Sequence, residues 1–244
     1  MRSRKSYLVF NLSLGMKNTK IAVLISGGLD SAVLLAWALA RYQTVYPIYV
    51  TSHHFWEKAE KNHLTRLMKS IRDKKLKPLT ILSSPTQDIS RNFWAVTGKK
   101  VPGKRSKDEA VYLPGKNVLL IAKTAVFCAE RKINEIALGV LKTNPFPDAT
   151  AEFFNHYEDA LSEGLGLKVK IRVPFLTKTK KEVMKMGEKF QLGVTFSCIH
   201  PTRNKHCGKC NKCAERQKAF KLIGMKDPTL YTFPRRVSRT AVSR

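Results

Sequence analysis

Six consecutive residues near the start of the chain have the types expected of a phosphate-binding loop. The run Ser-Gly-Gly-Leu-Asp-Ser at 26–31 follows a short apolar stretch and leads directly into an apolar helical pattern. Glycines let a ligand approach the main chain, and the amides at a helix start favour negative charge. The run lacks the Lys-Ser/Thr ending of the mononucleotide P-loop and the Gly-x-Gly-x-x-Gly spacing of dinucleotide folds. An ordinary turn in which Asp30 or Ser31 caps the helix explains the same residues.

Four cysteines form a second group with a defined chemistry. Cys198, Cys207, Cys210 and Cys213 are separated by eight, two and two residues. Paired Cys-x-x-Cys turns bring thiolates close enough for tetrahedral zinc. Structural disulfides are the alternative, but they fit poorly in a chain with no evident secretion signal. We interpret the zinc as structural because four thiolates leave no open coordination position for catalysis.

Two histidines and a fifth cysteine need no metal role. His200 and His206 lie inside the cysteine segment and could each replace one thiolate, but the four cysteines already complete the site. We expect both histidines beside the metal centre or on the surface. Cys128 lies in an apolar helical pattern and is expected to be a buried packing residue.

The chain is strongly basic. It has 45 Lys and Arg against 18 Asp and Glu, which gives a formal net charge of +27. Such a charge attracts polyanions, so a nucleic-acid partner is one hypothesis and a dispersed, solvated basic surface is the other. The basic clusters are not interleaved with regular aromatic residues, as a base-stacking platform would require. They lie at 74–77, 98–107, 177–181 and 235–239.

The composition otherwise indicates a cytoplasmic globular protein. The apolar fraction of 43% is ordinary, and the longest apolar run, at 21–39, is broken by polar residues and glycines. No run approaches the roughly 20 apolar residues that span a bilayer. Residues 1–18 are basic and then apolar, but they show no clear cleavage site, so we predict a cytosolic extension without a membrane role.

The elements that position these residues alternate along the chain. Short β-branched runs at 20–25, 45–50, 79–83, 135–140 and 169–173 are separated by helical patterns at 31–41, 57–72, 116–131 and 151–164. This alternation predicts an α/β fold with a five-stranded parallel, Rossmann-like sheet and helices on both faces. Ligands of such sheets bind beyond the carboxyl ends of the strands. The charged segment 88–114 shows little periodicity and is predicted to be a mobile excursion or a lid over the site.

Several motifs together resemble a known family. The run at 26–31 matches the pyrophosphate loop of the N-type ATP pyrophosphatases, which favours a phosphate site over an ordinary helix cap. The wider chain, over about residues 20–222, is similar to the 7-cyano-7-deazaguanine synthases of the queuosine and archaeosine pathway. The motifs that carry this resemblance are LPGKN (113–117), FPDATAEF (146–153), VPFLTKTKKEV (173–183) and the cysteine segment (196–220).

The resemblance implies a fold of the adenine nucleotide alpha hydrolase type and a specific reaction. A deazaguanine carboxylate is adenylated by ATP, ammonia displaces AMP to give an amide, and a second ATP activates the amide oxygen so that a nitrile forms. Mg²⁺ would bridge the phosphates, and a homodimer would be usual. The implied divisions are an extension at 1–18, an ATP pyrophosphatase domain at 19–190, a small helical zinc-binding region at 191–224 and a basic tail at 225–244. The implied ATP-binding residues are Ser26, Gly27, Gly28, Leu29, Asp30 and Ser31, with Asp30, Ser31 and Lys116 in catalysis.

The acceptor pocket departs from the family pattern. Lys142, Ala149 and Thr150 stand where Asp, Cys and Arg are usual in the family. A purine-like edge carries N–H donors, which a carboxylate can read and a lysine cannot. We therefore expect Asp148 or Glu152 to read this edge, while Lys142 meets the substrate carboxylate or a phosphate. The predicted substrate-binding residues are Lys142, Asp148, Glu152, His54 and Glu57.

Three hypotheses about function remain open from the sequence. The first is a small-molecule enzyme that makes the nitrile, and the extent of the motif match favours it. The second is a diverged relative that uses the same adenylation chemistry to modify a macromolecule, which is tRNA, DNA or a protein terminus, and the positive charge favours it. The third is a binding module that keeps the fold without turnover.

Overall fold

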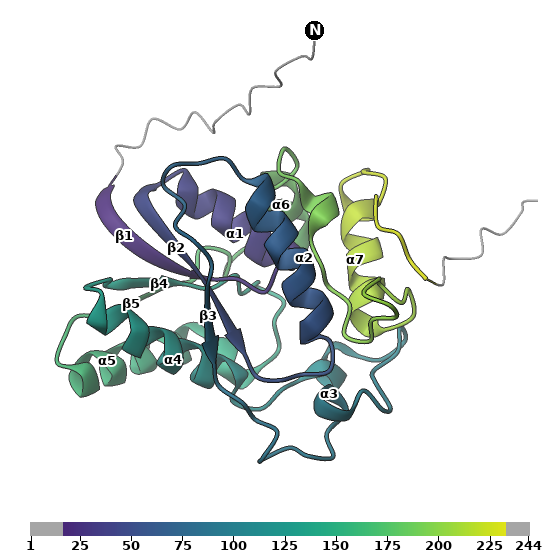
Figure 1. The fold of residues 1–244 in the computed structure, drawn as a ribbon, viewed down its shortest axis with the longest axis horizontal. Helices are drawn as coiled ribbons and strands as arrows, with labels where there is room; N and C mark the ends of the chain where they lie inside the picture. Colours follow the sequence, from purple (N-terminus) through teal and green to yellow (C-terminus); the bar gives the residue numbers. More distant parts are fainter. Residues whose placement is uncertain (1–16, 233–244) are drawn as a thin grey trace, which may run out of the picture.

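The computed structural model describes residues 17–232, which form a five-stranded parallel sheet with helices packed on it (Figure 1). The strand order is β3-β2-β1-β4-β5, and every neighbouring pair is parallel. The prediction of five parallel strands is therefore confirmed. Most of the predicted extension at 1–18 and much of the predicted tail at 225–244 lie outside the described residues. The strands are β1 (Lys17–Leu24), β2 (Tyr42–Thr51), β3 (Thr80–Ser83), β4 (Glu135–Ala137) and β5 (Lys170–Arg172).

Helices form most of the connections and the C-terminal region. The predicted helical patterns correspond to α1 (Leu29–Leu39), α2 (Glu57–Ser70), α4 (Lys116–Glu130) and α5 (Ala151–Leu165). Helix α7 (Asn211–Leu222) belongs to the helical region that the resemblance implied at 191–224. The sequence patterns did not indicate α3 (Trp94–Thr97), α6 (Lys180–Met186) or the 3₁₀ turns η1 (Asp108–Val111), η2 (Pro147–Ala149) and η3 (Leu192–Val194). Within residues 17–232, no helix has the length and apolar character needed to span a membrane.

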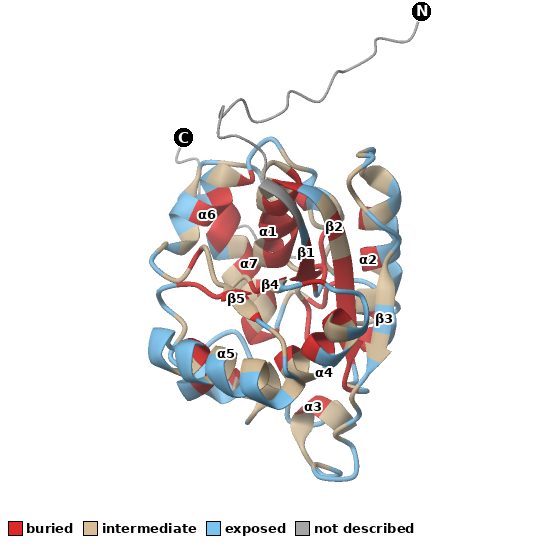
Figure 2. Cartoon of the chain, turned by 90° about the vertical axis from the view of Figure 1, so that its left-hand side faces the viewer, coloured by how far each residue is buried: buried red, intermediate tan, exposed pale blue. Residues whose placement is uncertain are grey.

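Alternate side chains of the central strand enter two separate hydrophobic cores. Ile21 and Val23 of β1 pack with residues of α1, α2, α6 and α7. Ala22 and Leu24 of the same strand pack with residues of α4 and α5 on the opposite face. Figure 2 shows the buried residues concentrated on the strands and on the inward sides of the helices. Helices on both faces of a parallel sheet were predicted, and the two cores confirm them.

The strand order creates a point of divergence between β1 and β4. From β1 the chain continues to β2 and β3 on one side of the sheet, and β4 and β5 lie on the other side. Connections that leave a sheet in opposite directions open a crevice at the carboxyl ends of the two strands. The loop at 26–31 follows β1, and Gly139 lies just beyond β4. A Cβ on Gly139 would lie 3.4 Å from the main chain of Asp30, so the two strand ends are in close contact.

The segment 88–114 packs against the cysteine-bearing region. Ala95 and Val111 are buried in a third hydrophobic core that also contains the four clustered cysteines. The main-chain N–H of Lys104 donates to the carbonyl oxygen of Lys209 at 2.9 Å. This packing does not fit the predicted mobile excursion, and Trp94, Val111 and Leu113 of the segment line the cavity described below, while a lid stays a prediction.

The beginning of the predicted basic tail also packs on the cysteine-bearing region. The N–H of Thr232 donates to the carbonyl oxygen of His206 at 2.8 Å, and the ring of Tyr231 meets the His206 ring edge-on. The hydroxyl of Thr229 accepts a hydrogen bond from Arg216 Nε at 2.6 Å. Residues 225–232 are therefore part of the folded unit.

Candidate active site and metal centre

A cavity of about 370 Å³ lies at the carboxyl ends of β1 and β4. Its volume is within the range of small-molecule sites in proteins. The lining comes from segments that are far apart in the sequence: the loop at 26–31, the first turns of α2, α4 and α6, the residues after β4, and α7. A cavity therefore lies at the strand ends, where the sequence predicted the ligand site.

The loop at 26–31 leaves the first amides of α1 free for a ligand. Gly27 has φ +78°, a left-handed conformation that side chains rarely adopt. Gly28 is the N-cap of α1, and no side chain among the described residues caps this helix. The Ser31 hydroxyl donates to the carbonyl oxygen of Gly28 at 3.1 Å and lies 3.3 Å from the Ser26 hydroxyl. The alternative in which Asp30 or Ser31 caps the helix is therefore not realised, because both lie inside its first turn.

The side chain of Leu29 is not part of this polar surface. It is 4% exposed and packs in the core beneath α1. Leu29 can therefore contact a phosphate only through its main-chain amide. Its role in the predicted loop is to anchor the start of the helix while the residues on either side face the cavity.

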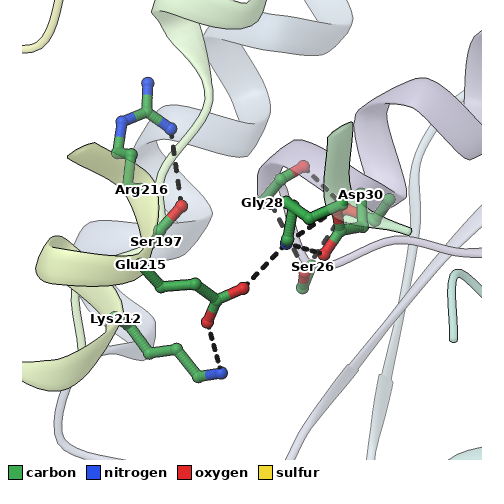
Figure 3. A network of polar contacts seen from close by, with 9 residues as sticks. Ser26, Gly28, Asp30, Ser197, Lys212, Glu215 and Arg216 are labelled. Atoms are coloured by element: carbon green, nitrogen blue, oxygen red, sulfur yellow. Dashed lines mark hydrogen bonds and ion pairs between the residues drawn. The ribbon is translucent and has the colours of Figure 1, made fainter. Parts of the chain in front are cut away.

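A chain of ion pairs connects the loop to α7 (Figure 3). Lys180 Nζ lies 2.9 and 2.7 Å from the two carboxylate oxygens of Asp30, and 2.7 Å from Glu215 Oε1. Glu215 Oε2 in turn accepts from Lys212 Nζ at 2.7 Å. Burial alone would lower the pKa of Lys180, but the two carboxylates hold it above its ordinary value. Burial would raise the pKa of Glu215, but Lys180 and Lys212 lower it to about 2.

Lys180, Lys212 and Glu215 were missed in the sequence. The first of them lies in the basic cluster 177–181, which gave no reason to separate one lysine from its neighbours. A local signal was present, because Thr179 and Glu182 form a capping box at the start of α6. That box places Lys180 in the first helical turn, where it reaches Asp30 across the core.

Aromatic and charged groups from α2, α3 and α4 line the cavity as well. Trp56 and Trp94 stack with their ring centroids 5.7 Å apart and an interplanar angle of 20°. The ammonium of Lys116 lies 5.9 Å from the centroid of the Trp56 ring. Glu60 accepts a hydrogen bond from the Tyr49 hydroxyl at 2.7 Å. Burial raises the pKa of Glu60 to about 7, although Lys116 and Tyr49 act in the opposite direction.

Two of the predicted substrate residues, Glu57 and His54, make contacts that fix the segment between β2 and α2 beside the cavity. Glu57 is buried, and its carboxylate accepts from the main-chain N–H groups of Ser52 and His53 at 2.8 and 3.1 Å and from the Thr51 hydroxyl. His54 stacks on Trp56 with centroids 4.7 Å apart. Burial, with help from Lys116, lowers the pKa of His54 to about 4, so this ring is neutral near pH 7.

The remaining predicted substrate residues divide into one at the cavity and two outside it. Asp148 is buried and lines the cavity, and its Oδ2 accepts from the main-chain N–H of Asn117 at 2.9 Å, in the first turn of α4. Lys142 and Glu152 are exposed and do not contribute to the lining. The structure therefore brings Asp148, Glu57 and Lys116 to the cavity and leaves Lys142 and Glu152 on the surface.

The four clustered cysteines form a candidate metal centre. Cys198, Cys207, Cys210 and Cys213 are buried, and their sulfur atoms all lie within 4.8 Å of one another. Main-chain N–H groups donate to the sulfur atoms of three of them at 3.3–3.4 Å, as thiolates require. The described groups can thus hold one metal ion with four thiolate ligands.

Neither the nearby histidines nor the fifth cysteine completes this centre. His206 is buried, and its Nε2 accepts from the N–H of Ser197 at 3.1 Å. Burial lowers the pKa of His206 to about 3, whereas His200 is on the surface. Cys128 packs in the core beneath α4, where burial raises the pKa of its thiol to about 12. The predicted places of all three residues are confirmed.

The fold and site define an α/β protein with a glycine-rich loop at the switch point of a parallel sheet and a four-cysteine cluster. The model of the family described as "Queuosine biosynthesis protein QueC" matches residues 20–224, and the chain belongs to this family. The predicted family resemblance is therefore confirmed.

Individual relatives match along almost their whole length. The chain is 30% identical to the 7-cyano-7-deazaguanine synthase of Methanococcus aeolicus over 87% of this chain and 99% of the relative. It is 29% identical to the enzyme of the same name from Thermoplasma volcanium over 91% of this chain and 95% of the relative. Among solved structures, the U34-tRNA thiolase NcsA from Methanococcus maripaludis with its [4Fe-4S] cluster is similar, with a TM-score of 0.48 and 13% identity over 86% of this chain and 69% of that one.

Proposed function

We propose that this protein is an ATP-dependent enzyme that converts a deazaguanine carboxylate and ammonia, through an amide, to a nitrile. One observation supports this proposal most directly. A single cavity joins an uncapped glycine loop and its lysines to a stacked pair of tryptophans and a half-buried glutamate. The first set of groups suits a polyphosphate, and the second suits a flat heterocycle with N–H donors.

The phosphate groups of ATP would be held by the loop and by α6 and α7. The free amides at the start of α1 donate to the pyrophosphate portion, and Lys180 and Lys212 neutralise its charge. Asp30 is the carboxylate that would hold Mg²⁺, which would neutralise negative charge on the phosphates when bound. Both oxygens of Asp30 contact Lys180, so this ammonium would contact the phosphates instead if Asp30 held a metal ion.

The acceptor would lie against the tryptophans. Glu60, which sequence analysis did not single out, takes over the reading of the N–H edge that we had expected of Asp148 or Glu152. Lys116 is close to Trp56 and would orient the substrate carboxylate. A carboxylate oxygen attacks the α-phosphorus and pyrophosphate leaves. Ammonia then attacks the carbonyl carbon and AMP leaves with the oxygen.

The nitrile would require a second activation in the same cavity. The amide oxygen attacks the α-phosphorus of another ATP, and pyrophosphate leaves again. Loss of AMP and of the amide protons then gives the carbon–nitrogen triple bond. Both activations would use the same loop, lysines and acceptor pocket, so the intermediate amide need not move to a second site.

The metal held by the four cysteines would be Zn²⁺ in a structural role. Zinc–sulfur bonds of about 2.3 Å in a tetrahedron place the sulfur atoms about 3.8 Å apart. The Cys198–Cys210 and Cys207–Cys213 sulfur separations are both 3.9 Å. All five cysteines of the chain lie in the described range and are free thiols, which suits the reducing cytoplasm.

The proposal is tested by following both products. The purified protein is incubated with ATP, Mg²⁺, ammonium and the deazaguanine carboxylate, and pyrophosphate and the nitrile are quantified, the latter by mass spectrometry. We expect pyrophosphate release to require the carboxylate and about two ATP to be used per nitrile. Pyrophosphate release that needs tRNA, DNA or a protein terminus instead would support the macromolecular alternative, and binding without any release would support a binding module.

A further inference from the structure

A pair of aromatic rings is stacked on the outer surface beside the cavity wall. The rings of Phe55 and His200 have centroids 5.7 Å apart and an interplanar angle of 20°. Phe55 is 44% exposed, and His200 is also exposed. Each ring directly adjoins, in the sequence, a residue that lines the cavity, namely Trp56 and Ile199. The two segments are remote in sequence, so only the fold creates this aromatic platform.

A basic loop begins at the edge of this platform. Gly98, with φ +67°, lies so close to Phe55 that a Cβ on it would be 2.6 Å from the ring. The N–H of Phe55 also donates to the carbonyl oxygen of Ala95 at 2.8 Å. The exposed residues Lys99 and Lys100 follow Gly98 directly. The first two cations of this loop are therefore neighbours of the aromatic pair.

A second basic segment follows the other ring of the platform, in the cysteine-bearing region on which the first loop packs. Gly103 and Cys210 form an antiparallel bridge, and the N–H of Asn211 donates to the carbonyl oxygen of Pro102 at 2.9 Å. The hairpin at 202–205 follows His200 by one residue and carries further exposed cations. Within residues 17–232, none of the following exposed cations takes part in an ion pair: Lys99, Lys100, Lys104, Arg105, Lys107, Arg203 and Lys205.

We propose that this surface, the Phe55–His200 pair with the cations at 99–107 and 203–205, binds single-stranded nucleic acid. An unpaired base stacks on the exposed aromatic faces, and successive phosphates contact the cations around them. Two exposed aromatic rings fit a base better than they fit an acidic protein, which would use the charges alone. A membrane would require several exposed aliphatic side chains, whereas the residues around the pair are mostly charged. This binding does not depend on the proposed ATP chemistry.

The test measures binding of fluorescein-labelled single-stranded RNA and DNA to the full chain by fluorescence anisotropy at several salt concentrations. We expect single strands to bind more tightly than a duplex of the same length. Phe55→Leu, which keeps apolar bulk but removes the ring, should weaken binding of the single strand by about 5- to 100-fold. Phe55→Tyr, which keeps the ring, should bind like the unchanged protein.

The cations are tested separately from the rings. Lys99→Gln with Lys100→Gln should reduce the slope of log affinity against log salt by about 1.4, because each lost phosphate contact contributes about 0.7. The matched control is Lys168→Gln with Lys189→Gln, which removes two exposed cations elsewhere and should leave the slope unchanged. Circular dichroism and metal content confirm that each variant is folded.

Specific outcomes would overturn the proposal. Equal affinity of the Leu and Tyr variants at Phe55 would show that no base stacks there. If the two double variants changed the salt dependence of binding equally, binding would depend on the overall positive charge and not on this surface. Tighter binding to phosphatidylserine vesicles than to any oligonucleotide, with the same dependence on residues 99 and 100, would assign the surface to membranes instead.

Discussion

Lys180 Nζ lies 2.7 Å from Glu215 Oε1, and this lysine joins Asp30 in the loop at 26–31 to the helix that carries the last of the four clustered cysteines. The same ammonium holds Asp30, and Glu215 is two residues beyond Cys213 on α7. The segment before the cysteines reinforces this connection, because the N–H of Phe196 donates to the carbonyl oxygen of Gly27 at 2.7 Å. The four-cysteine cluster therefore lies close enough along the chain to help place Glu215 and the loop at 26–31.

Replacement of the bridging lysine should affect activity more than stability. In Lys180→Met, Asp30 and Glu215 lose their shared partner and the phosphates lose a cation. We expect kcat/KM for ATP to fall by at least about 100-fold. The free energy of unfolding should fall by about 2 kcal/mol, less than for a fully buried pair because the cavity admits water. Pyrophosphate release and urea unfolding measure the two effects.

The control for this change is Lys181→Gln, which neutralises the exposed neighbour in the same helical turn. It should retain both activity and stability. If Lys180→Met released pyrophosphate as fast as the control, the lysine would be a structural contact only.

A side chain in the glycine loop should remove nucleotide binding and leave the fold in place. In Gly28→Val the new Cβ would be 3.3 Å from Ser26 Oγ and 3.6 Å from the carbonyl oxygen of Phe196, and φ is not left-handed at this position. The substitution should therefore not strain the backbone, but the valine side chain would crowd the amides at the start of α1. Isothermal titration with ATP should show no binding, while the melting temperature changes little. Unaltered ATP affinity would rule out the loop as the phosphate site.

Loss of one thiolate should release the metal and loosen the C-terminal region. Cys210→Ala leaves three ligands, and we expect the zinc content to fall from about one ion per chain toward zero. The melting temperature should drop by roughly 10 °C. Elemental analysis and differential scanning calorimetry provide the measurements. Cys128→Ala is the matched control, because it removes a buried thiol outside the centre and should keep the zinc.

The half-buried carboxyl of Glu60 should make stability depend on pH. Its pKa is about 7 in the folded protein, against an ordinary value of 4.5. Between these values the folded state keeps a proton that the unfolded chain has lost, so stability falls as pH rises from about 4.5 to 7. Glu60→Gln keeps an acceptor for Tyr49 but carries no charge. It should therefore be more stable than the unchanged protein at pH 8, by the order of 2 kcal/mol, and equal to it near pH 4.5.

The measurement is urea unfolding across this pH range. Glu57→Gln serves as a contrast, because the Glu57 carboxylate accepts from two main-chain N–H groups and its removal should destabilise the protein at pH 8. A stability difference between Glu60→Gln and the unchanged protein that does not vary with pH would show that this carboxyl titrates normally.

Local patterns were sufficient to predict the sheet and its ligand edge. β-branched runs and helical periodicity act over a few residues, and the two cores form because both faces of each central strand are apolar. The loop at 26–31 and the four cysteines were also predictable, since each group is nearly contiguous in the sequence. Their chemistry depends on local spacing, and the fold preserves that spacing.

Contacts between remote segments could not be predicted in the same way. Asp30 and Lys180 are 150 residues apart, and nothing near either residue identifies the other. Lys142 and Glu152 were assigned to the site because they follow β4, but position in the chain does not fix the direction of a side chain. Glu152 lies in the first turn of α5, where Thr150 caps the helix and the glutamate faces solvent. The aromatic platform was missed for the same reason, since Phe55 and His200 meet only in the folded chain.

The position of α7 late in the chain also determines when the cavity is completed during synthesis. All five strands of the sheet and the loop at 26–31 precede residue 173, so they are synthesised before α6 and α7. At that stage Asp30 has neither Lys180 beside it nor the groups on α7 behind it. If the protein uses ATP as proposed, a chain that lacks α6 and α7 should not support the reaction, because Lys180, Lys212 and Glu215 are absent from its cavity.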